Sequence, residues 1–591
     1  MYEESLESGE NIVEQQMTSL EQLISRPADA PCATGRVALW PEGKMPYRQD
    51  HQIGALTDES CAPGFNPDEH RMPYIEWFEP EGEKRSDICM ILISGGGYNN
   101  CCDVGLIDEW RRVFTGMGIV CANLAYRTPR PKGLPIYASA WADGQRAVRL
   151  VRNEAARRGF SPEKIGAIAM SAGSHLATLL AVSSLFPAYE PVDELDAIPC
   201  HINWALTDAI AYGTTDACFH GTPGTRDGDA IDVFLDPAFK FDAKTCPMCM
   251  THGGEDPYTP ATSALVYREL RKRGIPAEVH LYPDRGHGAF GFDRQLEFMR
   301  QMGYLGDTGA EIPLMQRFAS DDARADHTKS LIWPDGLMPD PQPGQCEPYI
   351  EWHFPKTLTT KAIQIIFAGG CYCRNDPDDY EVAPFRRYLN EKGMTVVTLK
   401  YRSPRPAAPL AKHTTAWQDL QRAVRIVRSE AAARGLAPDR IGIMGSSAGG
   451  HLALMGATSS KRHAYWPIDD LDRQVPCNVQ WAVLFYPAYL LTDGIEEPNT
   501  TGGNDDSARL AREFSFDLDT PPMLFVHGDT DEWAAMNSVK TWEQLRRMGI
   551  QGELHTLALR GHCFQRTAAP GTGSYTCPDR IWEFLTDKKL L

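Results

Sequence analysis

Two serines lie where a short apolar run meets a segment with helical spacing. One is Ser171 in the sequence AMSAG at 169–173, and the other is Ser447 in GSSAG at 445–449. Small residues two positions before and after such a serine permit a sharp strand-to-helix turn, which holds the hydroxyl outside the sheet. The turn also brings the hydroxyl near backbone N–H groups at the start of a helix, where negative charge is stabilised. The pattern predicts two nucleophiles that could attack a carbonyl carbon.

A serine nucleophile needs a base, and the base needs an acid that orients it. In each half of the chain an aspartate follows an apolar run ending in His-Gly, and a histidine follows Arg-Gly in a glycine-containing loop. The spacing from aspartate to histidine is the same in both halves, and the order Ser, Asp, His is that of α/β-hydrolases. Glu255 and Asp529 are rivals for the acid, but they are not in register with each other. The predicted catalytic sets are Ser171, Asp256 and His287, and Ser447, Asp531 and His562.

Glycines that follow an earlier apolar run could supply the donors for an oxyanion. These segments are SGGGY at 94–98 and AGGCY at 368–372. Glycine lets the backbone approach a substrate closely and turn its N–H groups inward. Tyr98 and Tyr372, which end the segments, are expected either to line the substrate pocket or to pack in the core. The candidate donors are Gly96 or Gly97 with Ala172, and Gly370 or Cys371 with Ala448.

The chain repeats itself with a period of about 275 residues, which is the size of a domain. WADGQRAVR at 141–149 recurs as WQDLQRAVR at 417–425, and YRTPRP at 126–131 recurs as YRSPRP at 401–406. In each half, apolar runs alternate with segments of helical spacing, which favours a mostly parallel sheet flanked by helices. The sequence therefore predicts the α/β class with two tandem domains. The predicted ranges are an N-terminal arm at 1–35, a first domain at 36–310, a linker at 311–330 and a second domain at 331–591.

Some residues depart from the pattern or support it from outside. Ala169 replaces the usual glycine before the first serine, and we expect the methyl to be tolerated with a slight distortion. Cys371 replaces a glycine, so its N–H can serve only if the local φ allows it. Arg127 and Arg402 are expected to anchor loops through ion pairs with Asp143 and Asp419.

The composition of the 591 residues, with 42% hydrophobic and 23% charged, is that of a globular protein. The net charge of −19 and the lack of a basic stripe exclude nucleic acid as a partner. No apolar run approaches the roughly 20 residues that span a bilayer, and the acidic N-terminus is unlike a secretory signal. We therefore expect no membrane partner and a cytoplasmic location. The 16 cysteines show no paired ligand spacing, so we predict reduced thiols and no metal.

Together, the glycine-tyrosine segment, the Tyr-Arg-x-Pro-Arg segment, the serine turn, the His-Gly-x-x-Asp strand end and the Gly-His loop resemble the α/β-hydrolase superfamily. Within it, they are similar to the lipase/esterase branch near bacterial carbohydrate esterases of the acetyl xylan and feruloyl types. The resemblance covers about 40–310 and 331–591. It implies a serine esterase without a cofactor that acts on short acyl esters, often acetyl groups of plant glycans. The histidine of the usual His-Gly-Gly-Gly segment is missing here.

Three alternatives stay open at this point. The first is a feruloyl-type hydrolase of aromatic esters. The second is a serine peptidase like prolyl oligopeptidase, although no propeller repeat is visible in the sequence. The third is a chain with one catalytic half and one glycan-binding half. In the esterase readings the partner is a small-molecule or oligosaccharide ester, and no sequence feature specifies an oligomeric state.

Overall fold

The computed structural model describes residues 35–53, 72–80, 82, 85–101, 104–214, 231–288, 290–306, 309–318, 324–492 and 508–591. The predicted N-terminal arm at 1–35 lies almost wholly outside these residues. The chain divides into two compact units, which are described separately. The first comprises Met1–Val266 with Arg285–Gln295, and the second comprises Tyr267–Asp284 with Leu296–Leu591.

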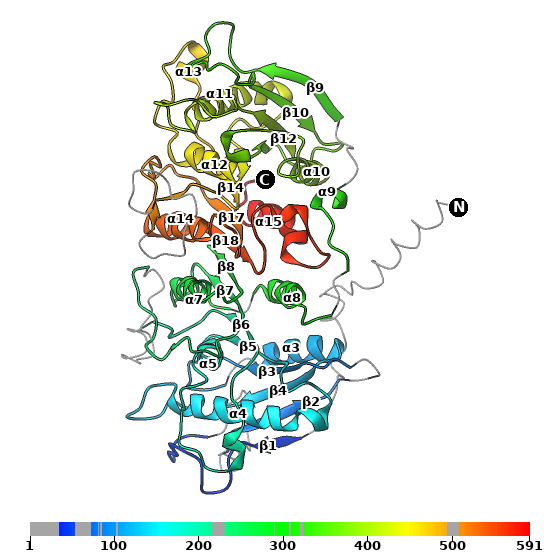
Figure 1. Cartoon of the computed structure of the whole chain (residues 1–591), viewed down its shortest axis with the longest axis vertical. Helices are drawn as coiled ribbons and strands as arrows, with labels where there is room; N and C mark the ends of the chain where they lie inside the picture. Colours follow the sequence, from blue (N-terminus) through cyan, green and yellow to red (C-terminus); the bar gives the residue numbers. More distant parts are fainter. Residues whose placement is uncertain are drawn as a thin grey trace, which may run out of the picture. The chain divides into compact units, whose positions relative to one another are not determined.

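The first unit is built on a mixed sheet in the order β1-β2-β4-β3-β5-β6-β7. The strands from β4 to β7 in this order are parallel, and β1 and β2 at the edge are antiparallel. Helix α3 lies on one side of the strands and α5 on the other (Figure 1). The elements are β1 (Arg36–Ala38), β2 (Tyr74–Phe78), β3 (Cys89–Ile93), α3 (Val104–Gly116), β4 (Val120–Ala125), α4 (Ala138–Arg158), β5 (Ile165–Met170), α5 (Ala172–Val182), η3 (Glu194–Ala197), β6 (Trp204–Asp208) and β7 (Met248–Gly253).

The second unit has a sheet in the order β8-β18-β17-β14-β13-β11-β12-β10-β9. The run from β18 to β12 is parallel, while β8, β10 and β9 are antiparallel to their neighbours. The strands are β8 (Ala277–Tyr282), β9 (Arg324–Leu331), β10 (Tyr349–Phe354), β11 (Ile363–Phe367), β12 (Thr395–Lys400), β13 (Ile441–Ser446), β14 (Trp481–Phe485), β17 (Met523–Gly528) and β18 (Gly552–Leu557), with a separate pair β15 (Leu491–Thr492) and β16 (Arg509–Leu510).

Helices cover both faces of the second sheet, with α10 and α15 on one side and α12 and α14 on the other (Figure 1). The helices of this unit are α9 (Leu314–Arg317), η4 (Gly370–Tyr372), α10 (Ala383–Glu391), α11 (Thr414–Ala431), η5 (Ala432–Arg434), α12 (Ala448–Thr458), α13 (Asp470–Gln474), α14 (Met536–Arg547), η6 (Phe564–Arg566) and α15 (Gly573–Asp587). Two further helices, α7 (Ala261–Lys272) and α8 (Phe292–Gln301), have residues in both units.

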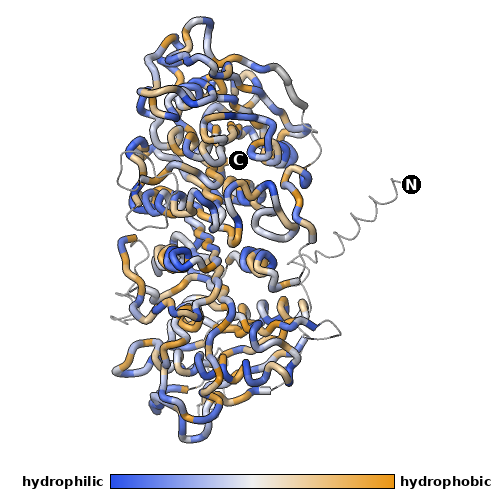
Figure 2. The backbone as a smooth tube through the Cα atoms, in the orientation of Figure 1, coloured by the Kyte–Doolittle hydropathy of each residue, from blue (hydrophilic) through white to orange (hydrophobic). Residues whose placement is uncertain are grey.

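The central strands are buried along their whole length, because helices cover both faces of the sheet. Every residue of β3, β5, β11 and β13 is buried, and apolar residues recur along the strands (Figure 2). Continuous apolar strands between helices are typical of parallel sheets. The predicted α/β class with a mostly parallel sheet is therefore confirmed. Within the described residues, every helix is too short or too polar to cross a membrane.

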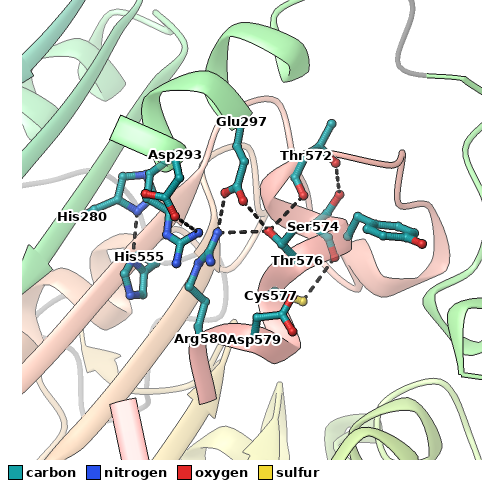
Figure 3. Close-up of polar contacts among 12 residues, drawn as sticks. His280, Asp293, Glu297, His555, Thr572, Ser574, Thr576, Cys577, Asp579 and Arg580 are labelled. Atoms are coloured by element: carbon teal, nitrogen blue, oxygen red, sulfur yellow. Dashed lines mark hydrogen bonds and ion pairs between the residues drawn. The ribbon is translucent and has the colours of Figure 1, made fainter. Parts of the chain in front are cut away.

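The compact units do not follow the boundary of the sequence repeat. Strand β8 pairs antiparallel with β18, and Nδ1 of His280 lies 2.9 Å from Nδ1 of His555. Glu297 receives a hydrogen bond from Thr576 of α15 at 2.8 Å and also contacts Arg580 (Figure 3). Two segments before residue 310, Tyr267–Asp284 and the chain from Leu296 onward, therefore belong structurally to the second unit. The predicted domain limits stay a prediction.

The segment predicted as a linker at 311–330 also has structure of its own. It contains α9 and all but one residue of β9, which pairs with β10. Leu314 and Phe318 are 0% and 5% exposed and belong to the apolar core of the second unit. Leu314 begins α9 and Phe318 directly follows it, and the burial of these two side chains anchors the segment.

Candidate active site

Both candidate nucleophiles lie on strained turns. Ser171 between β5 and α5 has φ 58° and ψ −125°, and Ser447 between β13 and α12 has φ 54° and ψ −122°. Such a conformation costs a non-glycine residue about 1–3 kcal/mol and persists only where neighbours fix it. The N–H of Ser447 donates to the carbonyl of Phe485 at 3.0 Å, and a Cβ on Gly449 would lie 2.7 Å from the carbonyl oxygen of Ala368. The two serines are thus held in nearly identical conformations.

Ala169 does not distort the first turn, contrary to the expectation. The φ of Ser171 is within a few degrees of that of Ser447. Ala169 pairs in register with Ile93, whereas Gly445 pairs with Phe367. The Phe367 ring would lie 2.7 Å from a Cβ on Gly445. The larger Phe367 is therefore paired with glycine and the smaller Ile93 with alanine, so the two residues of each pair fill a similar total volume.

The structure brings together all six residues of the predicted catalytic sets. In the first unit, Nε2 of His287 lies 2.8 Å from Oγ of Ser171, and its Nδ1 lies 2.8 Å from Oδ2 of Asp256. In the second unit, the corresponding distances from His562 to Ser447 and to Asp531 are both 2.8 Å. Each imidazole therefore has one nitrogen on the hydroxyl and the other on the carboxylate, as proton transfer from the serine requires.

The two aspartates are held by further contacts at the ends of β7 and β17. Oδ1 of Asp531 accepts the N–H of Trp533 at 2.8 Å, and Oδ2 lies 3.3 Å from His527. Burial of the carboxyl opposes ionisation, but hydrogen bonds from His527 and His562 outweigh it and hold the pKa of Asp531 well below its usual range. The acid is therefore ionised throughout the neutral range and can stabilise a positive imidazole.

The rival acids have other surroundings. Oδ2 of Asp529 accepts the N–H of Ala277 at 3.1 Å and lies 3.3 Å from Arg271. Burial raises the pKa of Asp529 to about 6. The N–H of Glu255 donates to the carbonyl of Arg285 and its side chain is exposed, whereas Oδ2 of Asp256 lies 2.8 Å from Nδ1 of His287. The arrangement favours Asp256 and Asp531.

The glycine-tyrosine segments run beside the serines in left-handed conformations. Gly96 and Gly97 have φ 113° and 62°, and Gly370 and Cys371 have φ 71° and 55°. Cys371 thus adopts the backbone conformation of Gly97 in the first segment. This is the φ that its N–H needs in order to serve as an oxyanion donor. The N–H groups at 99 and 100, and those at 373 and 374, donate to the carbonyls of Gly96 and Gly370 respectively.

The candidate oxyanion amides are left available by this arrangement. Among the described residues, no carbonyl accepts a hydrogen bond from the backbone N–H groups of Gly96, Gly97, Ala172, Gly370, Cys371 and Ala448. The carbonyls of Gly96 and Gly370 point into their loops. Because each peptide is planar and trans, the N–H groups of the next residues, Gly97 and Cys371, point to the opposite side. The choice between the two donors in each segment stays a prediction.

Tyr98 and Tyr372 pack in the core and do not line a substrate pocket. Their exposed fractions are 1% and 0%. Each hydroxyl lies 2.8 Å from Nδ1 of the histidine in the helix that follows the nucleophile, His175 or His451. The predicted pocket role is therefore corrected: a buried tyrosine hydroxyl needs a polar partner, and this histidine provides it.

The Tyr-Arg-x-Pro-Arg segment braces both sites. The hydroxyl of Tyr126 donates to the carbonyls of Ser94 and Gly95 at 3.0 and 3.2 Å. Tyr401 makes the same contacts to the carbonyls at 368 and 369. The predicted ion pairs are confirmed, because Arg127 lies 2.9 Å from Asp143 and Arg402 lies 2.8 Å from Asp419. All four ion-paired side chains are fully buried.

Several side chains near the sites were not singled out from the sequence. Nε of Arg130 donates to the carbonyl of Gly97 at 2.8 Å, and its Nη2 donates to the hydroxyl of Tyr212 at 2.8 Å. The ring of Tyr258 is 5.3 Å from that of His287, and the ring of Trp533 is 6.5 Å from that of His562. The two contacts of Arg130 join residues far apart in the sequence, so no local spacing indicates them. The recurrence of tyrosine and tryptophan two positions after the acids was the available signal.

One group of side chains in the second unit has the composition of a metal site. Ligand atoms of His413, His451 and Glu513 lie within 4.8 Å of one another. However, His451 is already bound to Tyr372 and lies 3.1 Å from Glu513. In the first unit Tyr137 packs against His175 at 5.1 Å, as His413 packs against His451 at 5.2 Å. Ring packing accounts for His413, and we assign no metal to the group.

Comparison with known proteins gives two family matches. The BD-FAE family model matches residues 75–194 and 351–545, which together are more than half of the chain. The model of the prolyl oligopeptidase family matches residues 149–305.

Curated relatives share up to about a quarter of their residues with the chain over the matched regions. The endo-1,4-beta-xylanase B of Butyrivibrio fibrisolvens is 25% identical over 211 residues, covering 34% of this chain and 32% of the relative. The acetylxylan esterase of Xylanibacter ruminicola is 23% identical over 220 residues, covering 36% and 42%. The probable carboxylic ester hydrolase LipM of Mycobacterium tuberculosis is 26% identical over 234 residues, covering 36% and 52%. The chain thus spans a third to a half of the length of these relatives.

Solved structures match about half of the chain. The acetyl ester-xyloside bifunctional hydrolase of Caldicellulosiruptor lactoaceticus is 22% identical, with 45% of this chain and 97% of that chain covered and a TM-score of 0.36. Esterase 2 of Thermogutta terrifontis is 20% identical, with 45% and 96% covered and a TM-score of 0.36.

Proposed function

Because the chain belongs to the BD-FAE family and has an α/β-hydrolase fold, we propose that it is a serine esterase with one catalytic site in each unit. The observation that carries the proposal is the pair of 2.8 Å contacts of each imidazole, one to the serine and one to the aspartate. The repeated order of elements around both serines supports a tandem duplication with its halves at 36–310 and 331–591.

The reaction is a two-step acyl transfer. His287 or His562 takes the proton from the serine while Oγ attacks the ester carbonyl, and backbone N–H groups hold the oxyanion. The imidazolium then gives its proton to the leaving alcohol, and the acyl group stays on the serine. Water attacks this acyl-enzyme with the imidazole again as base, which releases the acid and restores the serine. The aspartate holds the imidazole and stabilises its positive form.

We propose short acyl esters, above all acetyl esters on plant carbohydrates, as the substrates. Two of the relatives are an acetylxylan esterase and a xylanase. Aromatic rings stand beside both imidazoles, with Tyr258 in the first unit and Trp533 in the second. Such rings offer a flat apolar surface for a sugar or for an aromatic acyl group. Rates with acetylated xylan and methyl ferulate separate these two substrate types, and the faster one identifies the acyl preference.

A serine peptidase of the prolyl oligopeptidase type is the second candidate, because that family model matches residues 149–305. The order of nucleophile, acid and base is the same in both enzyme types, so the site alone favours neither. Turnover of a proline peptide amide with no turnover of acetyl esters would favour the peptidase. The cytoplasmic location predicted from the sequence stays a prediction.

Serine substitutions test the two-site function directly. Ser171→Ala and Ser447→Ala are each expected to remove the turnover of one site, and the double variant to lower the turnover of 4-nitrophenyl acetate by about 1,000-fold or more. If one single variant loses all activity, only one half is catalytic and the other is free to act as a glycan-binding module. If the double variant keeps full activity, the serine assignment is wrong.

A further inference from the structure

We propose that Glu381 is a positioning residue of the second site, which holds the backbone N–H of Gly369 and thereby fixes the segment carrying the candidate oxyanion donors. The proposal rests on the proposed esterase function and extends it for this unit. Glu381 comes two residues before α10, and no motif in the sequence connects it to the serine.

The first supporting contact joins Glu381 to the backbone beside the nucleophile. Its Oε2 accepts the N–H of Gly369 at 2.8 Å. A Cβ on Gly369 would lie 2.7 Å from Cβ of Ser447 and 2.5 Å from the carbonyl oxygen of Ser446, so this peptide touches the turn. The next two residues are the candidate donors. A hydrogen bond from an N–H to an ionised carboxylate is shorter and stronger than a neutral one, so ionised Glu381 holds the segment firmly.

The other carboxylate oxygen of Glu381 is connected to the catalytic imidazole by Tyr486, which contacts both groups. The hydroxyl of Tyr486 donates to Oε1 at 3.3 Å, and the ring of Tyr486 is 4.8 Å from that of His562. His562 also interacts with the carboxyl electrostatically. The negative charge of Glu381 therefore favours the positive imidazole that forms when His562 takes the serine proton.

The sequence of the first unit has no glutamate at the matching position. At the same distance before the shared Arg-Arg pair, at 111–112 and 386–387, the first unit has Leu106. Gly95 occupies the place of Gly369, and a Cβ there would lie 3.0 Å from Cβ of Ser171. The first unit has a buried carboxyl elsewhere: Oδ2 of Asp208 accepts a hydrogen bond from Gln295 at 3.2 Å. At this matched position the two units therefore differ by one carboxylate.

The ionisation of Glu381 lies close to neutral pH. Burial is the largest cause and raises its pKa to about 7, with a smaller contribution from Asp379. The Gly369 N–H, His562 and Tyr486 act in the opposite direction. The remaining groups that interact with its charge are Tyr380, Tyr401, Cys563 and Arg566. Because the ionised form predominates above about pH 7, the second site needs two groups without their protons, Glu381 and His562.

The test isolates the second site in the Ser171→Ala protein and compares Glu381→Gln and Glu381→Leu with their parent. We expect the leucine variant to lose about 10- to 100-fold in kcat with little change in KM, because an oxyanion donor acts in the transition state. We expect glutamine, which can still accept the N–H but carries no negative charge, to lose about 10-fold in kcat. On the acid side, log kcat/KM should approach a slope of two in the parent and of one in the glutamine variant.

A matched control is Glu553→Gln, which removes another buried carboxyl whose pKa burial raises to about 8, next to His555 on β18. It should leave the slope at two. The proposal on Glu381 is overturned if the glutamine variant keeps a slope of two, or if the folded leucine variant keeps full kcat. An inactive Ser171→Ala parent contradicts the two-site function itself, and with it the role of Glu381. Thermal unfolding of each variant identifies any that fail to fold.

Discussion

The two units hold the same contacts among serine, histidine and aspartate within different surroundings. All four distances from the imidazoles to serine and aspartate are 2.8 Å. In the first unit, Arg130 donates a hydrogen bond to the carbonyl of Gly97 in the oxyanion segment. The arginine that matches Arg130 in the second unit is Arg405, and its side chain is exposed. The second segment is instead held at the N–H of Gly369 by Glu381.

This difference separates what a serine site requires from what can vary around it. The strand ends and the sharp turn fix the three side chains of each proposed catalytic set, so the same arrangement recurs in both halves. The oxyanion segment needs only a firm hold on its backbone, and either a cation on a carbonyl or a carboxylate on an N–H can provide it. A carboxylate brings its own ionisation, so the two sites should differ in their response to pH.

The largest expected effect is loss of the orienting acid. We expect Asp531→Asn and Asp256→Asn each to lower kcat of its own site by about 10,000-fold, because the amide stabilises the wrong tautomer of the imidazole. Each variant is measured in the protein that lacks the other serine. Activity near that of the parent in either unit would show that the comparison pairs the wrong acid with that imidazole.

The next largest effect should come from the buried ion pairs. Arg127→Met leaves Asp143 as an uncompensated buried charge, and we expect it to lower the free energy of unfolding of the first unit by about 3–5 kcal/mol. Arg402 also donates to Oε1 of Gln418 at 2.9 Å, so Arg402→Met should cost at least as much in the second unit. Denaturant unfolding, followed together with the activity of each site, measures both. A change below about 1 kcal/mol would contradict the prediction.

A smaller effect sharpens the comparison of the oxyanion segments. A methyl on Gly369 would be 2.7 Å from Cβ of Ser447, and on Gly95 3.0 Å from Cβ of Ser171. We expect Gly369→Ala to lower kcat of the second site by about 100-fold, and Gly95→Ala to lower that of the first by less, because a misplacement near 1 Å costs this much. Steady-state rates in the single-site proteins test this, and equal losses would contradict it.

The smallest effect concerns the exposed thiol of Cys371, which stands where the first segment has Gly97. Cys371→Gly removes a side chain from a residue at φ 55°, and we expect kcat to stay within about twofold because glycine adopts this conformation freely. Iodoacetamide should inactivate the second site but not the first, and Cys371→Gly should remove this sensitivity. Equal inactivation of both sites would place the reactive thiol elsewhere.

Much of the site could be predicted because its residues belong to short sequence motifs. The serine turns, the His-Gly-x-x-Asp strand ends and the Gly-His loops recur in register, and the structure brings their residues together. The ion pairs of Arg127 and Arg402 were also predictable, since each arginine precedes the helix that carries its aspartate. The tyrosines of the glycine segments could not be assigned, because an aromatic residue beside a site packs inward or outward according to its partners.

From the sequence alone we could predict the α/β class, the repeat and the six side chains of the two proposed catalytic sets, because strand-to-helix turns and strand ends are local features with fixed spacing. The tertiary structure was needed to see that Tyr98 contacts His175 in the core and that β8 pairs with β18. It also decided that Glu381 reaches Gly369. These contacts join residues whose separation follows no period, so they are set by how the helices pack on the sheet and which buried polar groups need partners.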